Sequence, residues 1–146
     1  MEKRISLITG GFDPLHSGHI EYISAAKKVG NLLILGLNSD QWLIRKKGKF
    51  FMPLSERLII TRSLQDIDKV IEFNDDDDTA CSAIESVKAL YPNALVIFCN
   101  GGDRTKSNIP ELSIYKNDDR VKCMFGLGGE KKTNSSSSIL SKWTKT

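Results

Sequence analysis

The chain has 146 residues, of which 40% are hydrophobic and 27% are charged, and its formal net charge is +3. These values fit one globular domain over residues 1–146, and no apolar run approaches the roughly 20 residues of a membrane span. The small positive charge suits anionic small molecules and does not indicate a nucleic-acid partner. Three scattered cysteines without metal-site spacing, and an N-terminal apolar stretch too short for a signal peptide, predict a cytoplasmic protein.

The segment Thr9–His19 is the most informative part of the sequence. It follows the apolar run Arg4–Thr9, which predicts a buried strand, and it precedes a run with helical spacing that ends at Gly30. The first N–H groups of a helix have no intrahelical partner, and the helix dipole is positive there, so phosphate binds readily. The turn between this strand and this helix is therefore a predicted phosphate site.

The two histidines of the chain, His16 and His19, both lie in this turn. They are three residues apart and share one face of the helix, while Gly10, Gly11 and Gly18 leave room for a phosphate beside the backbone. Two imidazole donors and the helix N–H groups would stabilise negative charge that develops on a phosphorus atom. A pair of ordinary surface histidines is the alternative interpretation.

The run Gly11-Phe-Asp-Pro-Leu-His-Ser-Gly-His19 resembles the G-x-F-D-x-x-H-x-G-H motif of the cytidylyltransferase-like nucleotidyltransferases. That family includes glycerol-3-phosphate cytidylyltransferase and the heptose-phosphate adenylyltransferases. The resemblance implies transfer of a nucleoside monophosphate from a nucleoside triphosphate to a phosphorylated acceptor, with release of pyrophosphate. It implies that both histidines are catalytic and that Phe12, Asp13 and the neighbouring glycines bind the nucleotide.

A second apolar run, Asn31–Asn38, predicts a parallel strand, and Asn38–Asp40 predicts the cap of a short helix. Strand, helix and strand form a βαβ unit, which binds ligands beyond the carboxyl ends of its strands. The following Arg45–Phe50 predicts a basic loop, either a mobile clamp for a triphosphate or a solvated run of charge. The family has lysines in this loop, so the resemblance gives Lys46 a catalytic role and Lys47 a role in nucleotide binding.

Pro53–Leu58 predicts the start of another helix, with Ser55 as its cap. This part is similar to an E-x-R element of the family, which implies that Arg57 faces the nucleotide; an ordinary surface arginine is the alternative. A third strand is predicted over 68–73. We interpret the four carboxylates at 75–78 as solvated residues before a helix over 80–90, with Asp78 or Thr79 as its cap, and not as a metal site.

A fourth strand, over 92–99, brings Asn100-Gly-Gly-Asp-Arg104 to the same edge of the sheet. The resemblance to the G-G-D turn of the heptose-phosphate adenylyltransferases implies that Gly102 and Asp103 approach the nucleotide; a simple turn is the alternative. A fifth strand is predicted over 121–125. A helix start rich in serine follows it, which predicts a second phosphate site.

The resemblance assigns that second site, for the triphosphate, to Ser135, Ser136 and Ser137. The R-T pair that precedes these serines in the cytidylyltransferases is absent. Together the elements predict a single doubly wound α/β domain, Rossmann-like, with a parallel sheet and helices on both faces. This is the fold of the nucleotidyltransferases that carry the H-x-G-H motif.

The expected substrates are a nucleoside triphosphate, CTP or ATP, and a small phosphorylated polyol or sugar. Mg²⁺ is expected to bind through the triphosphate, without a dedicated protein site. The short length of the chain favours CTP and transfer of CMP, whereas the Gly-Gly-Asp and Asn-Ser-Asp segments favour a sugar-phosphate adenylyltransferase that uses ATP. A non-catalytic nucleotide-binding module on the same fold is the third hypothesis. A homodimer is the default assembly, with no nucleic-acid or membrane partner.

Overall fold

The structure, a computed structural model, describes residues 3–101, 109–128 and 135–144. Its strands are β1 (Arg4–Gly10), β2 (Leu32–Leu37), β3 (Lys69–Glu72), β4 (Leu95–Gly101) and β5 (Val121–Leu127). Its helices are α1 (Ser17–Val29), α2 (Asp40–Lys47), α3 (Leu54–Arg62), α4 (Cys81–Leu90), α5 (Pro110–Ile114) and α6 (Ser136–Thr144). Two residues predicted to approach the nucleotide, Gly102 and Asp103, lie outside the described residues.

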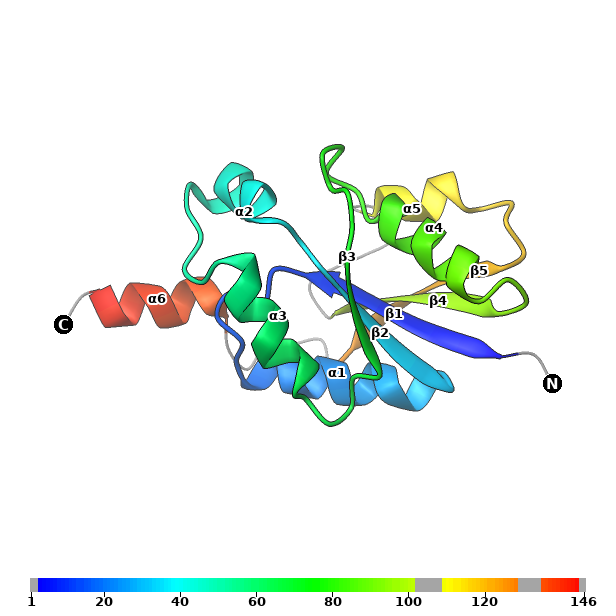
Figure 1. Ribbon diagram of the computed structural model, residues 1–146, viewed down its shortest axis with the longest axis horizontal. Coiled ribbons are helices and arrows are strands. Elements are labelled where there is room, and N and C mark those ends of the chain that lie inside the picture. Colours follow the sequence, from blue (N-terminus) through cyan, green and yellow to red (C-terminus); the bar gives the residue numbers. More distant parts are fainter. Residues whose placement is uncertain (1–2, 102–108, 129–134, 145–146) are drawn as a thin grey trace.

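The strands form one parallel sheet in the order β3-β2-β1-β4-β5. Helices α1 and α3 cover one face of the sheet, and α4 and α5 cover the other (Figure 1). The predicted doubly wound α/β fold is therefore confirmed. Since β1 pairs with β2 on one side and with β4 on the other, the strand order reverses between β1 and β4. In sheets of this kind ligands bind beyond the carboxyl ends of the strands at the reversal.

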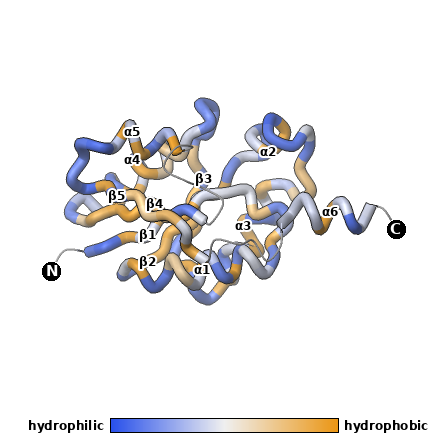
Figure 2. Tube along the Cα trace, turned by 180° about the vertical axis from the view of Figure 1, so that it is seen from behind, coloured by the Kyte–Doolittle hydropathy of each residue, from blue (hydrophilic) through white to orange (hydrophobic). Residues whose placement is uncertain are grey.

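Apolar side chains fill both faces of the sheet, which explains the continuous hydrophobic runs of β1 and β2. On β1, Ile5 and Leu7 pack toward α4, whereas Ile8 packs toward α1. Each of these side chains is fully buried and contributes about 1.5–3 kcal/mol relative to an exposed one. Figure 2 shows hydrophobic colouring along β4 and hydrophilic colouring over much of α2, which lies outside this core.

Helix α1 ends where the chain must pass close to β1. A Cβ on Gly30 would lie 2.7 Å from Ser6 Oγ and 2.8 Å from the Arg4 carbonyl oxygen, so only glycine fits. The Asn31 N–H donates to the same carbonyl at 2.7 Å. These contacts align β2 beside β1, and they explain why the predicted helix stops at Gly30.

The basic residues predicted to form a loop after α2 belong in part to the helix itself. Arg45, Lys46 and Lys47 make up the last turn of α2, and Gly48 ends the helix with a φ of 84° and an N–H···O bond of 2.8 Å to Ile44. Cations in a last turn interact favourably with the negative end of the helix dipole, and glycine tolerates the left-handed conformation after it. The predicted loop is therefore wrong for these three residues.

The caps predicted for α3 and α4 also differ from the observed ones. Ser55 lies inside α3, and the Leu54 N–H at its start donates instead to the Asp40 carboxylate of α2, at 2.9 Å. At α4 the N-cap residue is Ala80, so neither Asp78 nor Thr79 holds the predicted position. Thr79 Oγ1 accepts the Cys81 N–H at 3.2 Å, Asp78 pairs with Arg45, and the Ala80 N–H donates to the Glu111 carboxylate at 2.8 Å. Carboxylates distant in sequence can thus accept the N–H groups at a helix start, where the local sequence predicts that a neighbouring side chain does so.

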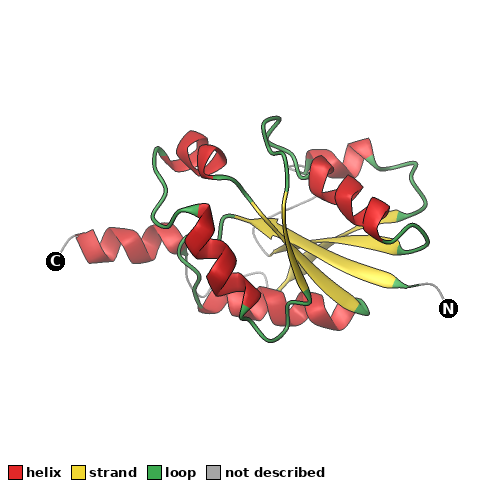
Figure 3. Ribbon diagram, in the orientation of Figure 1, coloured by secondary structure: helices red, strands yellow, loops and turns green. Residues whose placement is uncertain are grey.

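The C-terminal helix α6 extends away from the sheet (Figure 3). Within the part of the chain that the structure describes, no helix combines the length and the apolar character that crossing a membrane requires. The three cysteines are free thiols. Burial raises the pKa of the Cys99 thiol to about 12, so this core cysteine stays protonated at neutral pH.

Candidate active site

The loop that follows β1 passes over the carboxyl edge of the sheet at the reversal of strand order. Gly11 lies against α2, because a Cβ there would lie 2.7 Å from Leu43 Cδ2. Phe12 has a φ of 52°, and its buried ring lies 4.7 Å from the His19 ring, centroid to centroid. The loop is thus packed between α2 and α1, and it delivers the chain to the start of α1.

The two histidines cap α1 reciprocally. His16 is the N-cap residue, and its Nδ1 accepts the Gly18 N–H at 3.1 Å. In return, His19 Nδ1 accepts the His16 N–H at 3.3 Å. The two rings stack, with centroids 3.8 Å apart and an interplanar angle of 23°. This is the geometry of a capping box, built from two imidazoles in place of the usual hydroxyl and carboxylate.

The capping bonds determine which nitrogen of each ring carries hydrogen. A neutral imidazole that accepts a hydrogen bond at Nδ1 carries its hydrogen on Nε2. His16 and His19 are therefore both Nε2–H donors, held nearly parallel beside the N-terminus of α1.

A second helix N-terminus lies beside the same loop. Ser136 Oγ donates to the Pro14 carbonyl oxygen at 2.7 Å, and Ser136 itself is buried. Ser135 Oγ accepts the Ser138 N–H at 3.0 Å and so caps α6, while Ser137 is exposed. The predicted serine-rich helix start is present, and its contact with Pro14 brings it to the histidine loop.

The cations of α2 are on the solvent side of this region. Lys46 and Lys47 are exposed, and the Lys46 ammonium lies 5.6 Å from the Trp42 ring centroid. Trp42 is close to the loop, since a Cβ on Gly11 would lie 3.7 Å from its ring. The Trp42 ring is therefore close both to the Gly11 backbone and to the Lys46 ammonium.

Arg57 is buried, so the alternative of a surface arginine is wrong. Its side chain has no exposed area. It donates to the carbonyl oxygens of Gly11 and Asn38, at 3.0 and 2.7 Å, and it pairs with the Asp40 carboxylate at 2.7 Å. Arg57 therefore holds the loops after β1 and β2 together through their carbonyl oxygens. Its side chain is not accessible to a nucleotide in this structure.

Asp13 is likewise engaged with the protein. Its two carboxylate oxygens accept the N–H groups of Phe51 and Met52, at 2.6 and 2.7 Å. Both carboxylate oxygens thus hold the backbone of the segment that ends before α3. Among the described residues, no group of three or more His, Cys, Asp or Glu side chains could hold a metal ion. Within residues 3–101, 109–128 and 135–144, the side chains therefore do not form a site for a resident metal.

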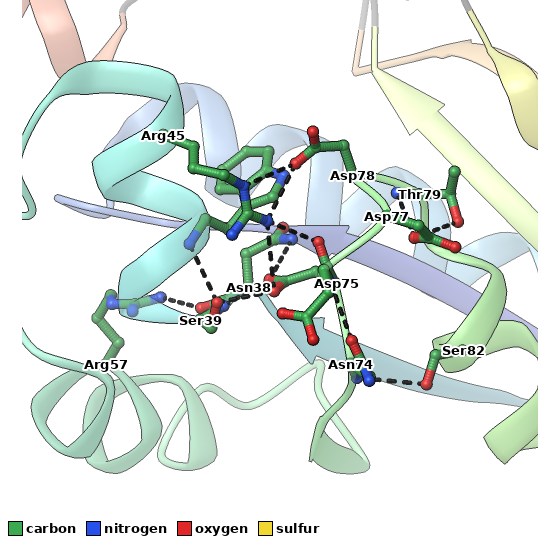
Figure 4. Close-up of polar contacts among 12 residues, drawn as sticks. Asn38, Ser39, Arg45, Arg57, Asn74, Asp75, Asp77, Asp78, Thr79 and Ser82 are labelled. Atoms are coloured by element: carbon green, nitrogen blue, oxygen red, sulfur yellow. Dashed lines mark hydrogen bonds and ion pairs between the residues drawn. The ribbon is translucent and has the colours of Figure 1, made fainter.

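The acidic run at 75–78 is only partly solvated, which corrects the interpretation made from the sequence. Asp75 is buried and accepts from Asn38 Nδ2 at 3.0 Å and from the N–H and hydroxyl of Ser39, each at 2.7 Å (Figure 4). Arg45 donates to the Asp75 carbonyl at 2.7 Å and pairs with Asp78 at 3.0 Å. Asp77 is exposed, and hydrogen bonds from Thr79 hold the pKa of its carboxyl below the usual value.

Sequence reasoning missed this Asp75 network, although a signal for it exists. Asn38 and Ser39 follow β2, Asp75 follows β3, and β2 and β3 are adjacent parallel strands. Polar residues at the carboxyl ends of neighbouring strands meet at one edge of the sheet. The network fixes the start of α2, and hence the helix that carries Lys46 and Lys47.

The fold is that of an α/β nucleotidyltransferase domain, and its histidine loop lies at the first strand-to-helix turn. The family model described as cytidylyltransferase-like matches residues 7–112, and the chain belongs to that family. This membership agrees with the motif that ends at His19.

Two curated relatives illustrate the similarity. The bifunctional protein HldE of Pelobacter propionicus is 34% identical over 146 residues, which cover 97% of this chain and 28% of that protein. The protein of the same name from Geobacter sulfurreducens is 37% identical over 142 residues, covering 94% of this chain and 27% of that protein. The chain thus spans about a quarter of the length of the curated relatives that it matches.

Solved structures share the fold at lower identity. A lipopolysaccharide core biosynthesis protein from Thermoplasma volcanium has a TM-score of 0.65 and 23% identity, covering 90% of this chain and 99% of that one. A nicotinic acid mononucleotide adenylyltransferase from Plasmodium falciparum has a TM-score of 0.52 and 17% identity, covering 93% and 82%. These similarities concern the fold alone.

Proposed function

We propose that this domain transfers AMP from ATP to the phosphate of a small phosphorylated sugar, with release of pyrophosphate. An oxygen of the acceptor phosphate attacks the α-phosphorus in line with the leaving group. A new oxygen–phosphorus bond forms while the bond from the α-phosphorus to the bridging oxygen breaks, and pyrophosphate departs with the electron pair. Such a reaction depends on positioning and on stabilisation of charge.

The observation that carries this proposal is the reciprocal cap of His16 and His19. Their Nδ1 atoms accept backbone N–H groups, so both neutral rings donate from Nε2 at the N-terminus of α1. We assign these two donors to the α-phosphate, where negative charge increases in the transition state. We also assign the space beside Gly18 to the nucleotide. The room expected at Gly10 and Gly11 is taken by protein side chains, since a Cβ there would lie 3.1 Å from the Phe12 ring and 2.7 Å from Leu43 Cδ2, respectively.

The remaining charge of the triphosphate requires further donors. The N-terminus of α6, with Ser135, Ser136 and Ser137, supports binding of the β- and γ-phosphates, since it lies beside the same loop. Lys46 and Lys47, in the last turn of α2, would supply further positive charge. Mg²⁺ would arrive with the triphosphate, whose oxygens suit it.

The choice of ATP depends on two segments of the sequence. Asn38–Asp40 and Gly101–Asp103 resemble the heptose-phosphate adenylyltransferases, and the curated relatives named HldE match nearly the whole chain. The length of the chain favoured CMP in the sequence analysis. That argument no longer distinguishes the two nucleotides, because the HldE relatives contain a matching region of the same length within a longer protein. Transfer of CMP from CTP is the second candidate, favoured by the description of the matching family model.

The test is an assay of pyrophosphate release with each of four nucleoside triphosphates and a panel of sugar phosphates, with Mg²⁺ present. We expect release that requires both ATP and an acceptor, and a product with the mass of the acceptor plus AMP. The His19→Ala variant is the matched inactive control. Release with CTP alone would support the second candidate, and release without any acceptor would contradict the transfer reaction.

A further inference from the structure

The segment Asp40–Met52, which consists of α2 and the turn that follows it, contains four cations, and its two ends are fixed by buried side chains. Arg45, Lys46, Lys47 and Lys49 are all exposed. The segment begins at Asp40, where Arg57 pairs with the carboxylate at 2.7 Å. It ends at Phe51 and Met52, where Asp13 accepts both N–H groups.

Asp13 connects this segment to the histidine loop. It is 2% exposed, and its two oxygens lie 2.6 and 2.7 Å from the N atoms of Phe51 and Met52. Hydrogen bonds to a carboxylate are stronger than those between neutral groups. Since Asp13 lies three residues before His16, these bonds set the distance between the end of the basic segment and the start of α1.

Arg57 completes the connection from the opposite side. Its Nε donates to the Met52 carbonyl at 3.0 Å, and its two terminal nitrogens reach Gly11, Asn38 and Asp40. Met52 is therefore held through its N–H by Asp13 and through its carbonyl by Arg57. The buried guanidinium group of Arg57 thus joins the loop after β1, the loop after β2 and the end of the basic segment.

We infer that Asp13 and Arg57 are positioning residues. They fix the position of Lys46 and Lys47 relative to His16 and His19, and they do not themselves bind substrate. This inference rests on the proposed function in one respect, namely that the lysines meet the phosphates. It gives Asp13 a role that differs from the one implied by the family resemblance. A nucleotide contact would leave a carboxylate oxygen directed at the ligand, whereas both oxygens are bonded to backbone N–H groups.

Limited trypsin digestion tests the structural part, because the segment contains four tryptic sites. In the Asp13→Asn variant, the side chain can accept only one of the two N–H groups. We expect cleavage within 45–49 to be about tenfold faster or more, since local opening controls cleavage. The control is Asp119→Asn, the same change at an exposed turn, which should leave the rate unchanged. A rate within twofold of wild type in a folded Asp13→Asn variant would overturn the inference.

ATP affinity in a double-mutant cycle tests the functional part. If Asp13 acts through Lys46, then Lys46→Ala weakens ATP binding in the wild type but has little further effect in the Asp13→Asn background. Additive losses would mean that Asp13 contacts ATP directly and would overturn the inference. If the wild type does not bind ATP, the proposed function fails, yet the trypsin result remains decisive for the positioning role.

Arg57→Lys is the second variant, in case Asp13→Asn does not fold. It keeps the buried positive charge but cannot reach three carbonyls and a carboxylate at once, because lysine lacks the planar fork. We expect the same faster cleavage between 45 and 49, and loss of the Lys46→Ala effect on ATP affinity. A folded Arg57→Lys protein with wild-type cleavage and additive losses would contradict the inference independently of Asp13.

Discussion

Ser136 donates a hydrogen bond of 2.7 Å to the carbonyl oxygen of Pro14, although the two residues lie 122 positions apart. This bond joins the N-terminus of α6 to the loop that carries His16 and His19. Both helix N-termini are electrostatically positive. The contact therefore brings together two helix N-termini, each of which the sequence analysis predicted to be a phosphate site.

Removing this hydroxyl should weaken triphosphate binding and stability together. We expect Ser136→Ala to lose about 1 kcal/mol of unfolding free energy, as for one hydrogen bond, and to weaken ATP binding roughly fivefold. Ser141→Ala is the control, because Ser141 is exposed on the same helix. Calorimetric titration and urea unfolding measure both effects. Unchanged ATP affinity in Ser136→Ala would separate α6 from the nucleotide site.

His16 has a structural and a proposed catalytic role, and two substitutions can separate them. His16→Ala removes the cap of α1 and should cost about 0.5–2 kcal/mol of stability. His16→Asn keeps a side chain that caps well, so its stability should stay close to wild type. We expect turnover to fall about a hundredfold or more in both variants, because neither retains the imidazole donor. A His16→Asn enzyme with wild-type turnover would remove His16 from the mechanism.

His19 can be examined in the same way. Glutamine at this position can reach back to the N–H of residue 16, as in an ordinary capping box. We expect His19→Gln to melt close to wild type, and both His19→Gln and His19→Ala to lose turnover by about a hundredfold or more. Steady-state pyrophosphate release measures the loss. Rates within threefold of wild type would show that His19 serves only as a cap.

The end of β5 depends on a glycine whose backbone lies against α1. Gly128 has a φ of 83°, and a Cβ there would lie 3.1 Å from the Tyr22 backbone. Gly126 has a φ of 72° but no atom within 4 Å of its Cβ position. Both alanine variants should lose stability, by roughly 1–2 kcal/mol for the strained φ alone, and Gly128→Ala should lose more. Equal urea midpoints would contradict the close packing against Tyr22.

Much of the fold could be predicted because its signals are local. The run Arg4–Thr9 is apolar and precedes a glycine-rich turn, and Ser39 caps α2 through the Trp42 N–H, at 3.1 Å. Each of these features involves residues close together in the sequence. All five predicted strands are present, with ends that differ by a few residues.

The parts that could not be predicted depend on contacts between distant segments. Arg57 occupies a helix position that suits a surface residue, and only the fold shows the three carbonyls around it. In the sequence, Asp75 is one of four adjacent acidic residues with nothing to distinguish it. Only the pairing of β3 with β2 brings it to Asn38 and Ser39. His16 is an unusual N-cap residue, so residue preferences did not indicate its capping role.

The most direct test of the account is the melting temperature of the protein with ATP, CTP, GTP or UTP, each with Mg²⁺. A ligand at a hundred times its Kd adds about 2.7 kcal/mol of stability, which corresponds to several degrees in a chain of this size. We predict a rise with ATP that is reduced in the Ser136→Ala variant. A rise with CTP alone would contradict the choice of base, and no rise with any nucleotide would contradict the triphosphate site itself.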